Sequence, residues 1–253
     1  MKLRCCFVPR QLLFLLAAGL NSPLTGTVSG QETITFRSGQ TQQVHILGVT
    51  TTGIKVQMNQ GVMVQPFTNI TAVTMEAPPE FTAAQAAYEA GDFQKALPLA
   101  DSVVKNYRGL PTDWARDAML MLGDLYVDVN KLPQAQAAYA DLQRAYPSAT
   151  GADIAVGMAR IDVSNKIYDA AKAKIEPILA QAQKQRNLPR AAAALIGRAY
   201  YISGQIKEAA GDFQGALEDY LKTVAVFPQD RVAASGAQDR ADSIRKDHNV
   251  VAP

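Results

Sequence analysis

Few residues of this 253-residue chain have the type and spacing that chemistry requires. The two histidines, His45 and His248, stand alone, without a second ligand at the spacing of a zinc site. The sequence holds no Gly-x-Ser-x-Gly elbow, no Walker loop and no Gly-x-Gly-x-x-Gly turn, which are motifs of acyl transfer and nucleotide binding. We therefore expect no catalytic residue, no cofactor and no metal site, and we interpret the chain as a protein without enzymatic activity.

One pair of carboxylates has a spacing that suits acid–base chemistry. Asp124 and Asp128 are four residues apart, which places both on one face of a helix. A catalytic pair could have this spacing, but charged residues along one helical face are usually solvated surface. We interpret the two aspartates as part of an exposed acidic face.

The helix that carries this pair belongs to the most regular pattern in the chain. Leu122-Gly123-x2-Tyr126 is followed by Ala135-x3-Tyr139 and by Pro147. This spacing resembles that of a tetratricopeptide repeat, a helix-turn-helix unit of about 34 residues. The small residues let two helices approach, the tyrosines fill the gaps between them, and the proline ends the second helix.

Weaker copies of the same hairpin turn occur on both sides. A turn, an apolar residue and then an alanine recur at Gly91-Asp92-Phe93 with Ala96, Asn130-Lys131-Leu132 with Ala135, Asn165-Lys166-Ile167 with Ala170, and Gly211-Asp212-Phe213 with Ala216. The first helix of the fourth copy is predicted to be long, from Pro189 to Ala210. Pro98 and Pro177 predict kinked or shortened second helices.

After Pro228, an amphipathic segment that Asp230 can cap provides the polar-backed helix that a repeat array needs at its open end. The predicted fold class is therefore mainly α, a tetratricopeptide-type α-solenoid of about four helical hairpins and a C-terminal capping helix. We assign residues 78–248 to this solenoid and residues 249–253 to a tail.

Residues 31–77 predict a small β domain. Five runs rich in β-branched residues are separated by turns, and Asn59-Gln60-Gly61 is a hairpin signal. Pro66 to Ile70 resembles the short helical turn before the last strand of SH3-like and Sm-like barrels. We therefore expect a five-stranded, barrel-like domain. Because so small a domain is marginally stable alone, we expect it to pack on a neighbour.

Residues 1–30 predict a secretory signal peptide. Lys2, Arg4 and Arg10 precede a short apolar run from Leu12 to Leu20, and a small-residue cleavage site follows at residues 28–30. Cleavage would remove all the cysteines and reverse the sign of the formal net charge of +2. We expect an exported protein, periplasmic or secreted, without stable membrane insertion after cleavage. A slightly acidic mature chain does not favour nucleic acid as a partner.

The repeats and the export signal together resemble exported tetratricopeptide repeat proteins of Gram-negative bacteria, among them periplasmic and outer-membrane assembly adaptors. The resemblance implies a non-enzymatic protein–protein interaction scaffold in the cell envelope whose partners are other proteins. Its oligomeric state stays open. An alternative is that the β domain is the ligand module, reading peptide or glycan, with the repeats as a spacer.

In the repeat register, the first helices share one concave surface that is suited to a partner segment. The surface lacks the Lys and Asn set that clamps a free carboxylate, so we expect a partner segment that is apolar with some basic residues. Ala159 lies on this surface, and the predicted partner-binding residues are Gln85, Tyr88, Leu120, Asp124, Val127, Asp162, Arg198 and Tyr201.

Export and cleavage lead to a direct test. Intact-mass analysis of the protein recovered from the producing cell should show the loss of about thirty residues, a typical signal-peptide length. Full-length protein in the cytosol, still carrying Cys5 and Cys6, would contradict the prediction.

Overall fold

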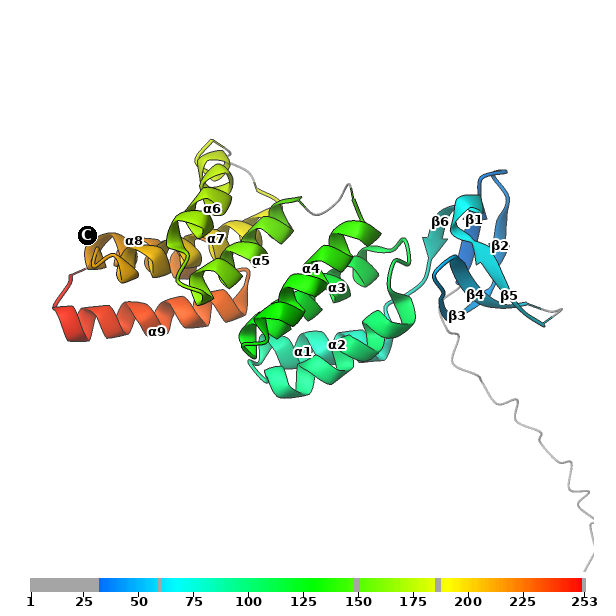
Figure 1. Ribbon diagram of the computed structural model, residues 1–253, viewed down its shortest axis with the longest axis horizontal. Helices are drawn as coiled ribbons and strands as arrows, with labels where there is room; N and C mark the ends of the chain where they lie inside the picture. Colours follow the sequence, from blue (N-terminus) through cyan, green and yellow to red (C-terminus); the bar gives the residue numbers. More distant parts are fainter. Residues whose placement is uncertain (1–31, 59–60, 148–150, 185–187, 252–253) are drawn as a thin grey trace, which may run out of the picture. The chain divides into compact units, whose positions relative to one another are not determined.

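The structure is a computed structural model that describes residues 32–58, 61–147, 151–184 and 188–251, so the predicted signal peptide lies outside the described residues. In these ranges the chain forms six strands, followed by nine α-helices in chain order (Figure 1). None of the described helices is long and apolar enough to cross a membrane.

The strands form two antiparallel three-stranded sheets. In the first, β1 (Thr33–Phe36) lies between β2 (Thr41–Gln43) and β6 (Ile70–Thr74). In the second, β4 (Gly53–Met58) lies between β3 (His45–Val49) and β5 (Gly61–Pro66), and the 3-10 turn η1 (Phe67–Asn69) leads from β5 to β6.

Alternation of side chains explains most of these strands. On β4, Ile54 and Val56 are buried while Lys55 between them is exposed, as the two-residue period of a half-buried strand requires. The expected helical turn before the last strand is present as η1. The expectation of five strands missed β2, because a three-residue Thr-Gln-Gln segment carries no apolar alternation. Strand β2 forms through its ladder to β1, to which Thr41 adds a hydroxyl contact of 3.0 Å with Thr35.

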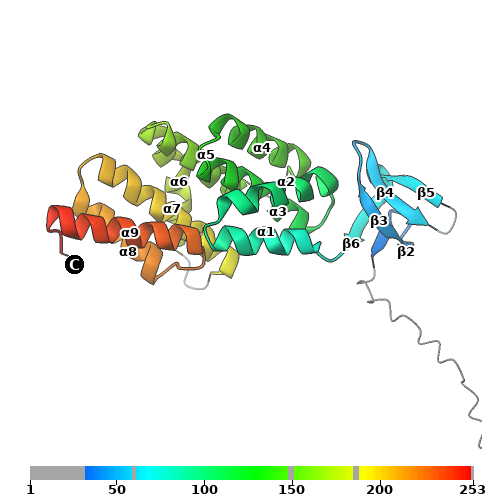
Figure 2. The same cartoon turned by 90° about the horizontal axis from the view of Figure 1, so that it is seen from below.

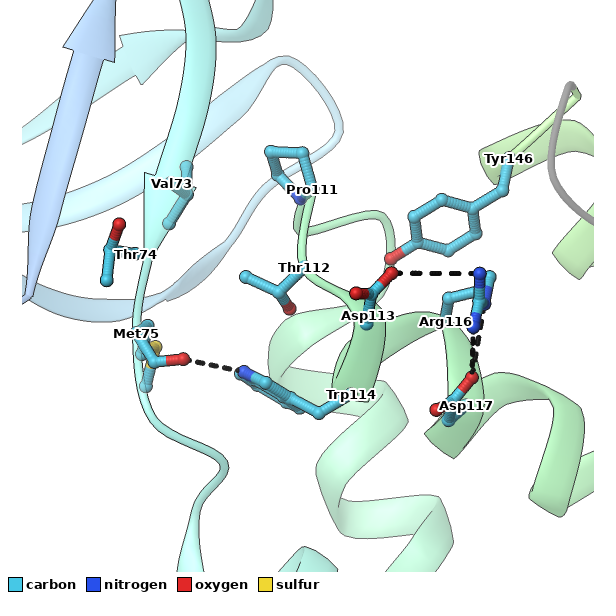
Figure 3. A pocket seen from close by; sticks show the side chains of 10 residues that line it. All are labelled: Val73, Thr74, Met75, Pro111, Thr112, Asp113, Trp114, Arg116, Asp117 and Tyr146. Atoms are coloured by element: carbon cyan, nitrogen blue, oxygen red, sulfur yellow. Dashed lines mark hydrogen bonds and ion pairs between the residues drawn. The ribbon is translucent and has the colours of Figure 1, made fainter. Parts of the chain in front are cut away.

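The core of the β region is completed by the helical region. Leu110 and Ala115 are buried against the cluster that contains Ile34, Ile46 and Ile54. The indole nitrogen of Trp114 donates a hydrogen bond of 2.9 Å to the carbonyl of Met75, just beyond β6 (Figure 3). The expectation that so small a β region packs on a neighbour is confirmed.

The helices form four hairpins and a last helix, which confirms the predicted fold class. The first helices of the hairpins are α1 (Pro79–Glu89), α3 (Asp113–Asp128), α5 (Gly151–Ser164) and α7 (Arg190–Ala209). The second helices are α2 (Phe93–Tyr107), α4 (Leu132–Ala145), α6 (Tyr168–Ala182) and α8 (Phe213–Ala225), and α9 (Arg231–His248) follows.

The third hairpin departs from the predicted register by one residue. Each hairpin turn contains one residue with positive φ, and these are Gly91, Asn130, Lys166 and Gly211. In the third turn the sequence pattern predicted that Asn165 occupies this turn position, but it is Lys166 that has the positive φ. The alanine buried at the crossing is accordingly Ala171, where the pattern pointed to Ala170. Burial of Ala171 and Ile175 along one face of α6 decides the register, although Asn tolerates the left-handed conformation better than Lys.

Both internal prolines lie within helices that continue past them. Helix α2 runs through Pro98 and α6 through Pro177, so neither helix is shortened. Both prolines are exposed, as are Gln94 and Ala173 one turn before them. The carbonyls that lose a helical N–H donor therefore lie on the solvent side, where water can replace it.

Gly123 is expected to be a stability determinant. A Cβ at this position would lie 2.5 Å from Cε1 of Tyr139, which is itself almost completely buried. Gly123→Ala should therefore lower the free energy of unfolding by about 1–3 kcal/mol, as overpacking of a core typically does. Gly151→Ala is the matched control, because a Cβ there meets open space at the start of α5. Thermal denaturation measures both, and equal melting temperatures would contradict the packing role.

Candidate functional site

Two neighbouring cavities open between the first helices and α9, and together we call them the groove. The larger groove cavity, of about 310 Å³, is lined by side chains that include Tyr88, Val127, Asp128, Arg160, Val163 and Tyr201. The smaller groove cavity, of about 240 Å³, is lined by side chains that include Gln85, Tyr88, Leu120, Asp124, Arg190 and Gln229. Both cavities also touch Arg198, Asp230 and Val232, so the groove joins α1, α3, α7 and the start of α9.

The polar centre of the groove is Asp124 on α3, which is only 2% exposed. Its Oδ1 accepts hydrogen bonds from the Tyr139 hydroxyl at 2.7 Å and from Arg160 Nη1 at 3.0 Å. Its Oδ2 accepts from Arg198 Nη1 at 2.8 Å. Both carboxylate oxygens are therefore satisfied, by donors from α4, α5 and α7, as a buried charge requires.

The two arginines continue this network in both directions. Arg160 Nη2 pairs with Asp128 Oδ1 at 2.5 Å, one turn further along α3. Arg198 Nε pairs with Asp230, the residue that caps α9 through a bond of 2.9 Å from the Ala233 amide to its Oδ1. We call the alternating series Asp128–Arg160–Asp124–Arg198–Asp230 the ion chain. It contains three carboxylates and two guanidiniums, so it carries one net negative charge.

The two ends of the ion chain differ electrostatically. At Asp230, burial opposes ionisation, but Arg198 and the Ala233 amide outweigh it and hold the pKa below its usual value. At Asp128, burial raises the pKa, and Arg160 offsets this only in part. Oδ2 of Asp128 is buried without a hydrogen-bond partner among the described residues. The Asp128 end of the ion chain therefore contains a carboxylate oxygen that is buried and unsatisfied among the described residues.

Seven of the eight predicted partner-binding residues line one or both of the groove cavities. Asp162 is the exception, because it pairs with Lys174 of α6 at 2.5 Å and lines neither cavity. The interpretation of Asp124 and Asp128 as an exposed acidic face is wrong, since both are largely buried against Arg160. Whether the residues that line the groove bind a partner stays a prediction.

Arg160 and the groove role of Asp230 were missed from the sequence. The one-residue shift in the third hairpin explains the first omission, because it moves Arg160 and Val163 to the positions expected for Ala159 and Asp162. Ala159 is instead fully buried between helices. Asp230 was expected only as a helix cap. Two acids one turn apart in the otherwise apolar stretch of α3 at residues 118–128 were the available signal, since buried carboxylates need a cationic partner.

A third cavity, of about 670 Å³, lies where the end of β6 meets α3 (Figure 3). Its polar groups are engaged within the chain. Arg116 pairs with Asp117 at 2.8 Å and with Asp113 at 3.7 Å, and the Tyr146 hydroxyl donates to the Leu110 carbonyl at 2.6 Å. We interpret this region as the joint between the β region and the first two hairpins.

The comparison with known families agrees with the repeat pattern seen in the sequence and with the helical hairpins of the structure. Residues 117–149, which span most of α3 and all of α4, match the family model described as tetratricopeptide repeat. A search of curated proteins finds no match to the chain. The match and the helical hairpins together support a tetratricopeptide repeat protein with a small β region before its helices. Such repeats generally mediate contacts between proteins.

Arg160 is expected to be essential to stability. Arg160→Met should lower the free energy of unfolding by about 3–5 kcal/mol at neutral pH, because it leaves buried carboxylates with one guanidinium fewer. Arg144→Met is the control, because Arg144 and its partner Asp141 are more exposed and such a pair is worth at most about 1 kcal/mol. Urea denaturation measures both variants, and equal losses would contradict the central role of the ion chain.

The loss in Arg160→Met should also shrink as the pH falls. Burial already raises the pKa of Asp128, and the variant lacks the arginine that opposes this shift. A carboxyl whose pKa is higher in the folded than in the unfolded state favours folding at low pH and loses that contribution as the pH rises through the folded-state pKa. If Arg160→Met lost the same free energy of unfolding at neutral and at mildly acidic pH, Asp128 would not be an uncompensated charge in the variant.

Proposed function

We propose that the chain is a non-enzymatic protein–protein interaction scaffold of the bacterial cell envelope, and that it binds a segment of another protein in the groove. The observation that carries the proposal is the pair of cavities on the side of the first helices, next to a segment that matches the tetratricopeptide repeat. The basic and apolar character of residues 1–30 supports export to the envelope.

The side chains of the groove favour a partner segment with apolar and basic residues. The larger groove cavity has apolar walls from Phe93, Val127 and Val163. Each cavity is also lined by a residue whose buried acceptor has no hydrogen-bond partner among the described residues, namely Asp128 with its Oδ2 in the larger and Gln229 with its Oε1 in the smaller. A donor such as a lysine, arginine or amide side chain would satisfy these atoms.

A free carboxylate suits the groove less well. Arg160 and Arg198 are the cations nearest its centre, and each already pairs with two aspartates. A carboxylate ligand bound at either of these two arginines would have to displace one of the buried pairs. It would also approach an ion chain that carries a net negative charge, which costs free energy at low dielectric.

Helix α9 sets how much of a partner can enter. Its start lies against the end of α1, where Arg231 Nη1 is 3.3 Å from Glu89 Oε2 (Figure 2). Val232 and Asp230 line both groove cavities from this side. Because α9 bounds the groove, we infer that the partner inserts a few side chains of one segment rather than lying along all the repeats.

Removing the two aromatic walls tests the groove. The protein would be used as bait in an extract of its own cell envelope, with partners identified by mass spectrometry. The double change Tyr88→Ala, Tyr201→Ala should reduce capture strongly, since a central aromatic residue often contributes about 2 kcal/mol or more to binding. Tyr168→Ala is the matched control, because this half-buried tyrosine at the start of α6 lines neither cavity.

Thermal denaturation must show that the double variant is folded. A folded double variant that captures the same proteins as the unmodified chain would refute the groove as the binding site. An equal loss of capture in the Tyr168→Ala variant would also refute the groove as the binding site, because Tyr168 lines neither cavity. Recovery of the protein itself only in the cytosolic fraction of the producing cell would refute the assignment to the envelope.

A further inference from the structure

The two sheets of the β region have four outer strands, and three of them are protected. Strand β2 is short and consists of Thr and Gln. Strand β6 exposes only Thr and Ala side chains. Strand β3 is interrupted by an irregularity between Ile46 and Gly48, where the Glu32 carboxylate accepts a bond from the Ile46 amide. A short polar edge, a bulge and a covering side chain are the usual means by which proteins prevent unwanted strand pairing.

Strand β5 is the outer strand without such protection in the described residues. It pairs with β4 on one side only. Its three central residues are apolar and exposed, Val62 to 52%, Met63 to 41% and Val64 to 44%. The ladder with β4 places Val62 and Val64 on the face of Lys55, whereas Met63 shares the other face with Val56. Apolar surface is therefore exposed on both faces of an unpaired edge, which is a template for another strand.

We propose that β5 is a dimer interface, in which it pairs antiparallel with β5 of a second copy of this chain. The pairing would join the two sheets of β3, β4 and β5 into one six-stranded sheet across a twofold axis. This inference is independent of the groove, because no residue of β5 lines either groove cavity.

The order of residues in β5 favours a second copy as the occupant. A twofold contact brings the same strand together in opposite directions, so the surface must be complementary to itself. Val62-Met63-Val64 has the same sequence in both directions. Pairing centred on Met63 places Met63 opposite its own copy and each Val62 opposite Val64 of the second copy. Cross-strand pairs of this apolar kind are the units that stabilise a sheet.

The charges around β5 agree with this occupant. Residues 61–66 carry no charge, so self-pairing places no like charges opposite each other. The nearest cation on the neighbouring strand is Lys55, opposite Val64. In the dimer it would be three strand spacings, about 14 Å, from its own copy. That distance exceeds the Debye length of about 8 Å at physiological ionic strength.

The size of the contact predicts reversible association. Pro66 at the end of β5 has no N–H to donate, so the shared ladder is limited to residues 61–65. So short a ladder buries less surface than the roughly 1,200–2,000 Å² of a stable interface. We therefore expect monomer and dimer in exchange, with the dimer gaining at high protein concentration.

Sedimentation velocity on the full purified protein, from micromolar to millimolar concentration, tests the proposal. The unmodified protein should shift from monomer to dimer. Val62→Lys and Val62→Glu should each abolish the dimer, because residue 62 and its own copy would be diagonal neighbours on one face. Mixing the two variants should restore the dimer as a Lys–Glu pair. Gln57→Lys is the matched control, since it adds the same charge next to Val62 on β4 and should leave the dimer intact.

Each remaining outcome would overturn the proposal. A protein that is monomeric at all concentrations, or a dimer that survives Val62→Lys, would exclude β5 pairing. β5 pairing would also be excluded if the mixture of the Val62→Lys and Val62→Glu variants stayed monomeric while both variants had the melting temperature of the unmodified protein. A monomer whose capture of another protein from the envelope extract is lost in Val62→Lys would instead identify β5 as the binding edge for a foreign strand.

Discussion

The burial of one carboxylate, Asp124, constrains the helical region more than any other single interaction. A buried charge is stable only when its hydrogen-bonding capacity is satisfied, and here the donors come from three different helices. In most repeat proteins each unit contacts only its neighbours along the array. The bond from Arg198 to Asp124 joins residues 74 positions apart and connects the second hairpin to the fourth. The ion chain then reaches α9 through Asp230. Unfolding of the repeats is therefore coupled beyond adjacent units, because opening one hairpin leaves charges of another without a partner.

The same carboxylate accounts for the small residues at the centre of the array. Tyr139 donates to Asp124, and its ring lies so close to α3 and α5 that a Cβ at Gly123 or Gly157 would be less than 3 Å from it. Tyr139 thus has two roles, because its hydroxyl donates a hydrogen bond to Asp124 and its ring packs closely against α3 and α5. Gly204 and Tyr220 repeat this contact in the fourth hairpin, where the hydroxyl of Tyr220 donates to Glu208. The repeat motif in the sequence reflects this arrangement of glycine beneath tyrosine.

The sequence was sufficient to predict the class of fold, because small residues, aromatic residues and turns recur along the chain with the period of the hairpins. It predicted most strands for a similar reason, since runs of β-branched and other apolar residues between turns mark every strand except the polar β2. The register of the third hairpin could not be read from its turn. The triplet at Asn165 is nearly identical to that at Asn130, yet burial along α6 shifts it by one residue. That shift concealed Arg160. The ion chain as a whole could not be predicted from the sequence, because its five members come from three helices and the cap of a fourth and become neighbours only when the repeats are stacked.

The contact between α9 and the beginning of the array has a consequence for how this protein can evolve. Arrays of repeats usually lengthen by tandem duplication, which inserts a unit without disturbing the remote ones. Here Arg231 pairs with Glu89 of the first hairpin. Asp230 pairs with Arg198, which also pairs with Asp124 of the second hairpin. An additional hairpin between the second hairpin and α9 would carry Arg198 away from Asp124 or from Asp230 and leave a buried charge uncompensated. The buried pairing therefore opposes insertion of a unit in this part of the array, whereas the exposed pair of Arg231 and Glu89 contributes little to that constraint.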